Sequence, residues 1–383
     1  MRVEPTRRSQ PLRAAFVMEQ ALGHVTHYRN VRQVVDHEPS VSPTWLPIPY
    51  EVVGAARLVP MLRSNWSVRA SWRARRALQS MSATSAFDAV FFHSQVTSLF
   101  SLDVMHRVPS VISLDATPIN YDSVAEPYGH RPAGNSVLDR QKYQLNRRAF
   151  HAADGLVTWS DWARRSLADD YGVDSDKVRV LAPGACSKYF DIGRSRLAAA
   201  ARDSDRLRIL FVGGDFKRKG GQLLLDLMRG PLGRTCELHI VTRATVPPQA
   251  NVFVYSGIEP NSEPLLRLFA NADLFVLPTY ADCLAVVLEE AAAAALPVIT
   301  TSVGALAEGV EEGESGLMVP AGDRRALEAA ISALVDDAPR RERMARAAHA
   351  LACRAFDADR NNRALLDYLH QVVESRRISR RAA

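Results

Sequence analysis

The segment "LFVLPTYADCLAVVLEEAAAAALPVITT" (residues 274–301) has short apolar runs at both ends and an alanine-rich stretch between them. Near-continuous apolar runs are typical of strands that are buried on both faces, as in parallel sheets with helical crossovers. The stretch that starts at Cys283 has a high helix propensity, and it ends before Pro297. The segment therefore predicts a strand, a helix and a second strand of one parallel sheet.

The same alternation of apolar runs and helix-like stretches continues on both sides of this segment. Further runs lie at residues 14–18, 89–93, 110–114, 155–159 and 178–184, and then at 207–214, 236–242, 252–257 and 316–320. The polar stretch 187–206 contains no strand-like run and separates the two series. We expect an α/β protein with two Rossmann-like doubly wound domains facing a cleft, over residues 1–187 and 207–356, with a linker at 188–206 and a helix at 357–383.

The composition indicates a soluble globular protein, with 47% hydrophobic and 23% charged residues. The four cysteines lie far apart, and their spacing indicates neither a zinc site nor a disulfide framework. No apolar run is long enough for a transmembrane helix, and the first run is too short for a signal-peptide core. A cytoplasmic protein fits these observations.

A candidate phosphate site lies in "LRILFVGGDFKRKGGQLLLDLM" (residues 207–228). Gly213 and Gly214 let a ligand approach the main chain after the predicted strand. Arg218 and Lys219 follow where a helix should begin, and cations beside free helix N–H groups form an anion site. The alternative is a solvated turn with two exposed cations.

Two carboxylates bracket the start of the predicted helix in the first segment. Asp282 should lie at the helix N-terminus and Glu290 about two turns further on. The backbone N–H groups between them belong to Cys283, Leu284, Ala285 and Val286, and would be anion donors. A sugar nucleotide offers sugar hydroxyls, a diphosphate and a ribose diol in comparable order. The alternatives are a plain helix cap for Asp282 and an exposed helix position for Glu290.

These motifs resemble glycosyltransferase family 4, the retaining sugar-nucleotide transferases of the GT-B fold. The resemblance rests on "DCLAVVLEEAAAAALPVI", "FVGGDFKRKGG" and "GVEEGESGLMVPAGD". Three departures stand out. Asp282 replaces the usual first Glu, Cys283-Leu284-Ala285 replaces the usual Gly-Phe-Gly, and Gly214 stands where the commoner form has Arg. Arg218 is the candidate to supply that missing charge.

The resemblance implies an acceptor-binding N-terminal domain and a donor-binding C-terminal domain, with the last helix packing back on the first domain. Gly23 and His24 resemble the early glycine loop of the family, and His93 resembles its histidine at the catalytic cleft. Asp115 ends the next predicted strand and would line the same cleft. The implied catalytic residues are His93, Asp282, Arg218 and Lys219.

The implied reaction is transfer of a sugar, a hexose in many members, from a UDP- or GDP-type donor with retention of configuration. The sequence offers no metal-binding carboxylate pair, so we expect no metal requirement and no cofactor. Two alternatives stay open, a sugar-nucleotide epimerase on the same fold and an inert protein that binds sugar nucleotides.

The net charge of +6 fits either a solvated basic surface or an anionic partner. Residues 61–81 carry five arginines and two tryptophans without an acid, a pattern that suits a helix in the headgroup layer of a membrane. Because many members of the family use lipid-linked acceptors, we expect contact with an anionic inner membrane face. The alternative is a domain helix whose tryptophans pack on the sheet. No nucleic-acid-binding pattern is present.

Overall fold

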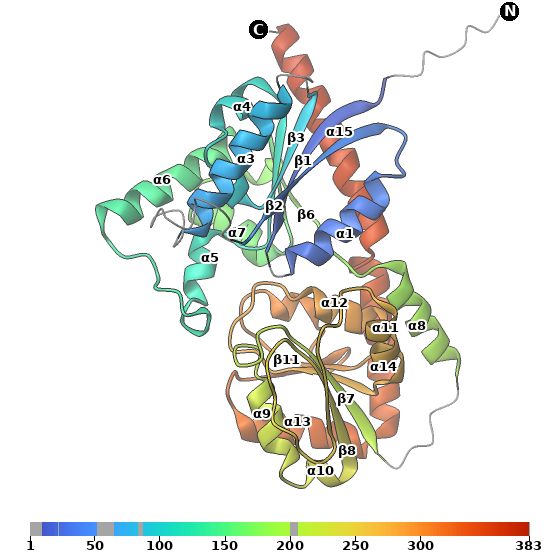
Figure 1. Ribbon diagram of the computed structural model, residues 1–383. Helices are drawn as coiled ribbons and strands as arrows, with labels where there is room; N and C mark the ends of the chain where they lie inside the picture. The colour runs from blue at the N-terminus through green and yellow to red at the C-terminus, as the bar shows by residue number, and fades with distance from the viewer. Residues whose placement is uncertain (1–9, 22, 52–64, 83–86, 200–205, 383) are drawn as a thin grey trace, which may run out of the picture.

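The computed structural model describes residues 10–21, 23–51, 65–82, 87–199 and 206–382, which form two parallel six-stranded sheets in separate lobes (Figure 1). The first sheet has the order β2-β1-β3-β4-β5-β6 and the second β12-β11-β10-β7-β8-β9. The first six strands are β1 (Leu12–Gln20), β2 (Val41–Pro49), β3 (Ala89–His93), β4 (Ser110–Leu114), β5 (Gly155–Thr158) and β6 (Val178–Val180). The others are β7 (Leu207–Val212), β8 (Cys236–Val241), β9 (Val252–Tyr255), β10 (Leu274–Leu277), β11 (Val298–Thr301) and β12 (Gly316–Val319). The predicted fold class is confirmed.

Helices cover both sheets. The first domain carries α1 (His24–Val35), α3 (Trp66–Ser82), α4 (Leu102–Arg107), α5 (Pro118–Ser123), α6 (Val137–Ala152) and α7 (Asp161–Asp169). The rest of the chain forms α8 (Ser187–Ala198), α9 (Gly221–Met228), α10 (Leu232–Thr235), α11 (Glu263–Asn271), α12 (Val286–Ala293), α13 (Arg324–Asp336), α14 (Ala338–Ala355) and α15 (Ala358–Ala382). The central strands β3, β4, β10 and β11 are buried along their whole length, as their continuous apolar runs predict.

Strand β2 is the one strand of the described sheets that the apolar runs did not predict. It contains Pro43, Pro47 and Pro49, which have no backbone N–H, and most of its side chains are partly or fully exposed. Proline is tolerated in a strand at the edge of a sheet, and β2 is the edge strand beside β1.

The expected linker at 188–206 contains a helix that is part of the second domain. In α8, Tyr189 and Phe190 belong to the same hydrophobic core as β7 and β10. Arg196 anchors the helix by donating to the carbonyl oxygens of Ala294, Ala272 and Phe269. The polar residues of α8 led us to expect a linker here, but the buried face of the helix packs on α11 and α12. Residues 200–205 of the expected linker lie outside the described residues.

The last helix returns to the first domain, as predicted. At the crossing point Ala185 bridges Asp357, with Ala185 N donating to Phe356 O over 2.8 Å. Helix α15 then lies along the first lobe (Figure 1), where it packs on α1 and inserts leucines and valines into the core formed with β1 and β3.

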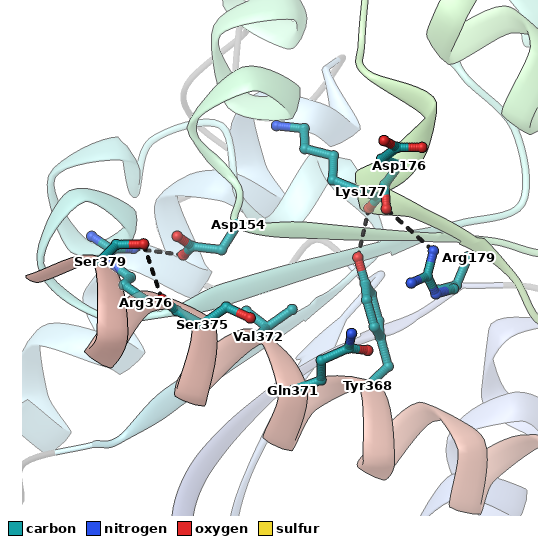
Figure 2. Close-up of a pocket in the computed structure, with 10 residues that line it drawn as sticks. All are labelled: Asp154, Asp176, Lys177, Arg179, Tyr368, Gln371, Val372, Ser375, Arg376 and Ser379. Carbon is teal, nitrogen blue, oxygen red and sulfur yellow. Dashed lines mark hydrogen bonds and ion pairs between the residues drawn. The ribbon is translucent and has the colours of Figure 1, made fainter. Parts of the chain in front are cut away.

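Figure 2 shows a cavity of about 300 Å³ between α15 and the segments that precede β5 and β6. Its charged groups are bound within the domain. Lys177 donates to the carbonyl oxygens of Phe150 and Ala153, and Arg376 pairs with Asp154 at 2.5 Å. The pair of Arg376 with Asp154 ties α15 to the domain, and the cavity lies away from the motifs that carry chemistry.

Candidate active site

The second domain brings its phosphate loop and its acidic segment together at the carboxyl ends of β7 and β10. Lys219 Nζ donates to the carboxylate of Asp282, and Arg218 Nη1 lies 3.6 Å from the same carboxylate. In open α/β sheets, ligands bind beside the carboxyl ends of the strands. The structure therefore brings these three residues together, and the side chains of Arg218 and Lys219 are largely buried instead of forming a solvated turn.

Glycines allow this close approach. Gly220 has φ +81°, and a Cβ there would lie 2.1 Å from the carbonyl oxygen of Pro278. A Cβ at Gly213 would lie 3.1 Å from the side chain of Lys219. Larger residues at either position would push the phosphate loop away from β10, and Lys219 away from Asp282. A Cβ at Gly214 would lie 3.9 Å from Arg243 Nε, an ordinary van der Waals contact, so packing does not require a glycine there.

Arg218 is almost completely buried, with 7% of its surface exposed. Its Nε donates to Asp215 over 3.2 Å, and Nη1 donates to the carbonyl oxygen of Ala281. Burial alone would lower the pKa of Arg218, but the Asp282 and Asp215 carboxylates and Tyr128 outweigh it and raise the pKa. The guanidinium is thus a fixed positive charge inside the domain.

The start of α12 corrects one prediction. The helix begins at Val286, with Ala285 as its N-cap residue, and Asp282 does not cap it. Residues 281–285 form a loop that other contacts hold: Ala305 N donates to Cys283 O over 2.8 Å, and Asp282 is bound by Lys219. The N–H groups at the helix end are consequently those of Val286 and Val287, because Leu288 N already donates to Ala285 O over 2.8 Å, and Cys283, Leu284 and Ala285 lead up to the helix.

Glu290 lies inside the protein and not on an exposed helix face, with 5% of its surface accessible. Burial raises the pKa of Glu290 to about 8. The neighbouring Glu289 is buried as well and accepts the N–H of Gly184 over 2.8 Å, beside the point where the chain crosses between domains. The two neighbouring buried carboxyls therefore have different partners: Glu289 holds the crossing segment, and Glu290 lies beside the hydroxyl of Tyr189.

The first domain contributes a cluster of imidazoles at the carboxyl ends of β1 and β3. His24 Nδ1 lies 2.8 Å from His93 Nε2, and His24 Nε2 lies 3.9 Å from the carboxylate of Asp115. Trp159 stacks on His93 with ring centroids 5.4 Å apart. Burial lowers the pKa of His93 well below its usual range, and burial raises that of Asp115. His93, which was predicted to be catalytic, thus meets His24 and Asp115 of the predicted acceptor side, and it lies fully buried behind His24.

A third histidine, which the sequence reasoning did not single out, completes the cluster. The ring of His27 lies 4.7 Å from that of His93, and burial lowers the pKa of His27 to about 3. Gly23 directly precedes α1, and a Cβ there would meet no atom within 4 Å. The cluster is therefore held neutral on its buried side, while Gly23 and His24 form its open side.

The matched families agree with this geometry. Residues 32–186 match the family described as Glycosyltransferase Family 4, and residues 206–337 match Glycosyl transferases group 1. Together the two segments cover more than half of the chain. The chain belongs to glycosyltransferase family 4.

Related family 4 enzymes extend over much of the sequence. The D-inositol 3-phosphate glycosyltransferase of Kineococcus radiotolerans is 29% identical over 72% of this chain and 69% of its own. The enzyme of the same name from Paenarthrobacter aurescens is 26% identical over 77% and 75%. Among solved structures, sucrose-phosphate synthase from Thermosynechococcus elongatus superposes with a TM-score of 0.74 at 16% identity, covering 95% of this chain and all (100%) of its own. Anabaena Alr3699/HepE in complex with UDP and glucose gives 0.67 at 14%, over 94% and 100%.

Contacts between the two domains of the glycosyltransferase come from residues that no motif pointed to. Tyr128 of the first domain lies over the guanidinium of Arg218, 4.2 Å from the ring centroid. Glu308 of the second domain accepts the N–H groups of Asp161 and Trp162, both at 2.7 Å, at the start of α7. Trp159 packs with Leu284 and Val286 in one small hydrophobic cluster. These residues are far apart in the sequence, and only the assembled fold reveals their pairing.

Proposed function

We propose that this glycosyltransferase moves a sugar from a nucleoside diphosphate sugar to a hydroxyl group of an acceptor, with retention of anomeric configuration. The observation that carries the proposal is the cluster of Arg218, Lys219 and Asp282 opposite the His24–His93–Asp115 cluster. One side offers cations for a leaving diphosphate. The other offers imidazoles and a carboxylate for hydroxyl groups.

On the donor side, Arg218 and Lys219 neutralise the charge that grows on the diphosphate as the sugar leaves. Asp282, which Lys219 holds in the free protein, then accepts from hydroxyls of the sugar. Glu290 accepts from the ribose, and the N–H groups of Val286 and Val287 bind the phosphates. The donor is of the UDP or GDP type, and the UDP type is supported by the fold that the chain shares with Anabaena Alr3699/HepE, whose structure holds UDP-glucose. Because the two cations supply the charge stabilisation, the reaction needs no metal ion.

On the acceptor side, His24 and Asp115 line the place where the acceptor hydroxyl meets the donor, and the buried His93 orients the ring of His24 from behind. The relatives are named for D-inositol 3-phosphate as acceptor. For this chain the acceptor is a glycan, a lipid-linked sugar or a small molecule, and the transferred sugar is a hexose. Closure of the domains keeps water from the reacting sugar and limits hydrolysis of the donor.

The test starts with calorimetric titration of UDP and GDP, followed by a panel of UDP- and GDP-sugars with product analysis. Binding of one nucleotide, and sugar transfer that depends on an added acceptor, are the expected results. An altered sugar nucleotide formed without acceptor would indicate an epimerase. Absence of binding to both nucleotides would contradict the proposal.

His93 provides a second check. We expect His93→Ala to lower turnover at least tenfold while the thermal midpoint stays nearly unchanged. A collapse of stability would instead identify the buried His93 as a structural residue of the imidazole cluster.

A further inference from the structure

Arg218 is in contact with an aromatic ring of the opposite domain. Tyr128 ends a short 3-10 helix (Glu126–Tyr128) in the segment between α5 and α6. Figure 1 shows that this segment hangs from the first lobe towards the second. The ring centroid of Tyr128 lies 4.2 Å from the guanidinium carbon of Arg218, and Tyr121 packs beside it at 4.8 Å.

A ring over the guanidinium does something that a hydrogen bond cannot. Arg218 already uses Nε for Asp215 and Nη1 for Ala281 O, and both partners belong to its own domain. The guanidinium is planar with five N–H donors at its edge, so a ring on its face fixes the plane without using any donor. The remaining edge donors stay available for an anion. Stacking also excludes water from the face, which strengthens the charge interaction.

The contact exists only when the domains are together, because its two members come from different domains. Burial raises the pKa of the Tyr128 hydroxyl far above its ordinary value, and the nearby Asp282 and Cys283 raise it further, so the hydroxyl stays neutral. An uncharged ring from one domain therefore lies on the donor-side cation of the other. This gives closure a direct effect on the charge that faces the diphosphate.

We propose that Tyr128 is a positioning residue that orients Arg218 towards the donor diphosphate in the closed protein, an inference that rests on the proposed function. It does not touch the reacting atoms. Its contribution belongs to the closed state in which transfer occurs, and the first encounter with the nucleotide needs only Arg218 and Lys219. Loss of the ring should therefore lower kcat more than it weakens nucleotide binding.

The test compares Tyr128→Leu with Tyr128→Phe, which keeps the ring and loses only the hydroxyl. We expect Tyr128→Leu to lower kcat at least tenfold, with UDP or GDP affinity within threefold of wild type and an unchanged thermal midpoint. Tyr128→Phe should keep at least a third of the wild-type kcat. In an Arg218→Ala background the change to Leu should have little further effect, because the two residues act as a pair.

The outcomes separate the two proposals. A wild-type protein that binds neither nucleotide contradicts the proposed function and this inference with it. A wild-type protein that transfers sugar, with Tyr128→Leu equally active or with effects that add to those of Arg218→Ala, contradicts this inference alone. An equal loss in Tyr128→Phe and Tyr128→Leu would also overturn it, because the hydroxyl and not the ring would then be responsible.

Discussion

At the scale of single residues, Lys219 has two tasks that mutations can separate. It should bind the donor phosphates, and in the free protein it neutralises the buried carboxylate of Asp282. We expect Lys219→Ala to weaken nucleotide binding by about 1–3 kcal/mol, as for other charge-assisted contacts, and to lower the thermal midpoint as well. Calorimetric titration and thermal denaturation measure the two effects.

The control is the double variant Lys219→Ala with Asp282→Asn. Asp282→Asn removes the buried negative charge that Lys219→Ala leaves unpaired. The double variant should therefore regain most of the stability and none of the nucleotide affinity. Arg218→Ala should weaken binding by a similar amount. Unchanged nucleotide affinity in both single variants would show that the phosphate loop is not part of the donor site.

Asp282→Asn alone should mainly lower turnover, because Asp282 meets the reacting sugar.

The buried carboxyl of Glu290 predicts a pH dependence. Its pKa is raised to about 8 in the folded protein, so the stability that the neutral carboxyl contributes is complete at acidic pH and is lost as the pH rises towards about 8. Glu290→Gln cannot ionise. Wild type and variant should therefore have similar thermal midpoints at about pH 5, and the variant should be the more stable one at about pH 9.

Nucleotide binding should change in the opposite direction. A carboxylate accepts both ribose hydroxyls, so the wild type should bind UDP or GDP more tightly as the pH rises from about 6 to 8, with uptake of the nucleotide linked to release of a proton. The Glu290→Gln variant serves as the reference. Ionisation of the nucleotide affects its binding in the same way, but its affinity should lack the extra rise that comes from the carboxyl. Parallel pH profiles for the two proteins would argue against contact between Glu290 and the ribose.

At the scale of secondary-structure elements, α3 can be compared with the membrane contact expected for residues 61–81. Residues 61–64 lie outside the described residues, and the helix runs from Trp66 to Ser82. Three of its arginines are bound within the domain: Arg69 to Tyr50 O, Arg73 to Glu51 O and Arg75 to Asp103. Trp72, with 45% of its surface exposed, and Arg76 stacked on it form the outward face.

The membrane contact is therefore predicted at the outward face of α3, through Trp72 and Arg76. We expect the protein to sediment with anionic vesicles at low salt, and Trp72→Ser with Arg76→Ser to reduce binding without changing the thermal midpoint. Arg75→Ser is the matched control of equal charge change, and should lower stability more. Each exposed cation contributes about 1 kcal/mol near an anionic leaflet. Equal binding by wild type and the double variant would leave α3 as an ordinary domain helix.

Sequence reasoning predicted best those elements whose structure follows from their local sequence. Buried strands such as β10 are continuous apolar runs, and the phosphate loop and Asp282 lie next to them in the chain. Predictions differed from the structure where distant contacts decide. Asp282 was expected to cap the helix. Its actual partner, Lys219, lies 63 positions away, and the sequence alone does not reveal that contact. Pairs such as Tyr128 with Arg218 join different domains, and no local pattern marks them.

At the scale of the whole molecule, Glu308 of the second domain binds the start of α7 in the first domain and so holds the two domains together. Its carboxylate accepts two N–H groups at the start of α7 in the other domain, where negative charge is favourable. We expect Glu308→Ala to shift the protein towards an open form, since loss of a helix-capping group costs about 0.5–2 kcal/mol. Small-angle scattering should then give a larger radius of gyration, and donor hydrolysis should increase relative to transfer.

The exposed Glu314, on the same segment of the second domain, provides the control. Glu314→Ala removes the same charge without a contact across the cleft, and should scatter like wild type. Identical scattering and partitioning for both variants would mean that the α7 contact has no part in closure.

The return of α15 also has a consequence for the order in which the chain folds. Leu365, Leu369 and Val372, close to the end of the chain, belong to the core that β1 and β3 form near its beginning. A domain made first on the ribosome normally folds before the rest is synthesised. Here the first domain lacks part of its core until residues 365–373 have been synthesised, whereas the core around the second sheet is formed by residues 185–356, which precede them. The half of the molecule that is made second is thus the first that can become native.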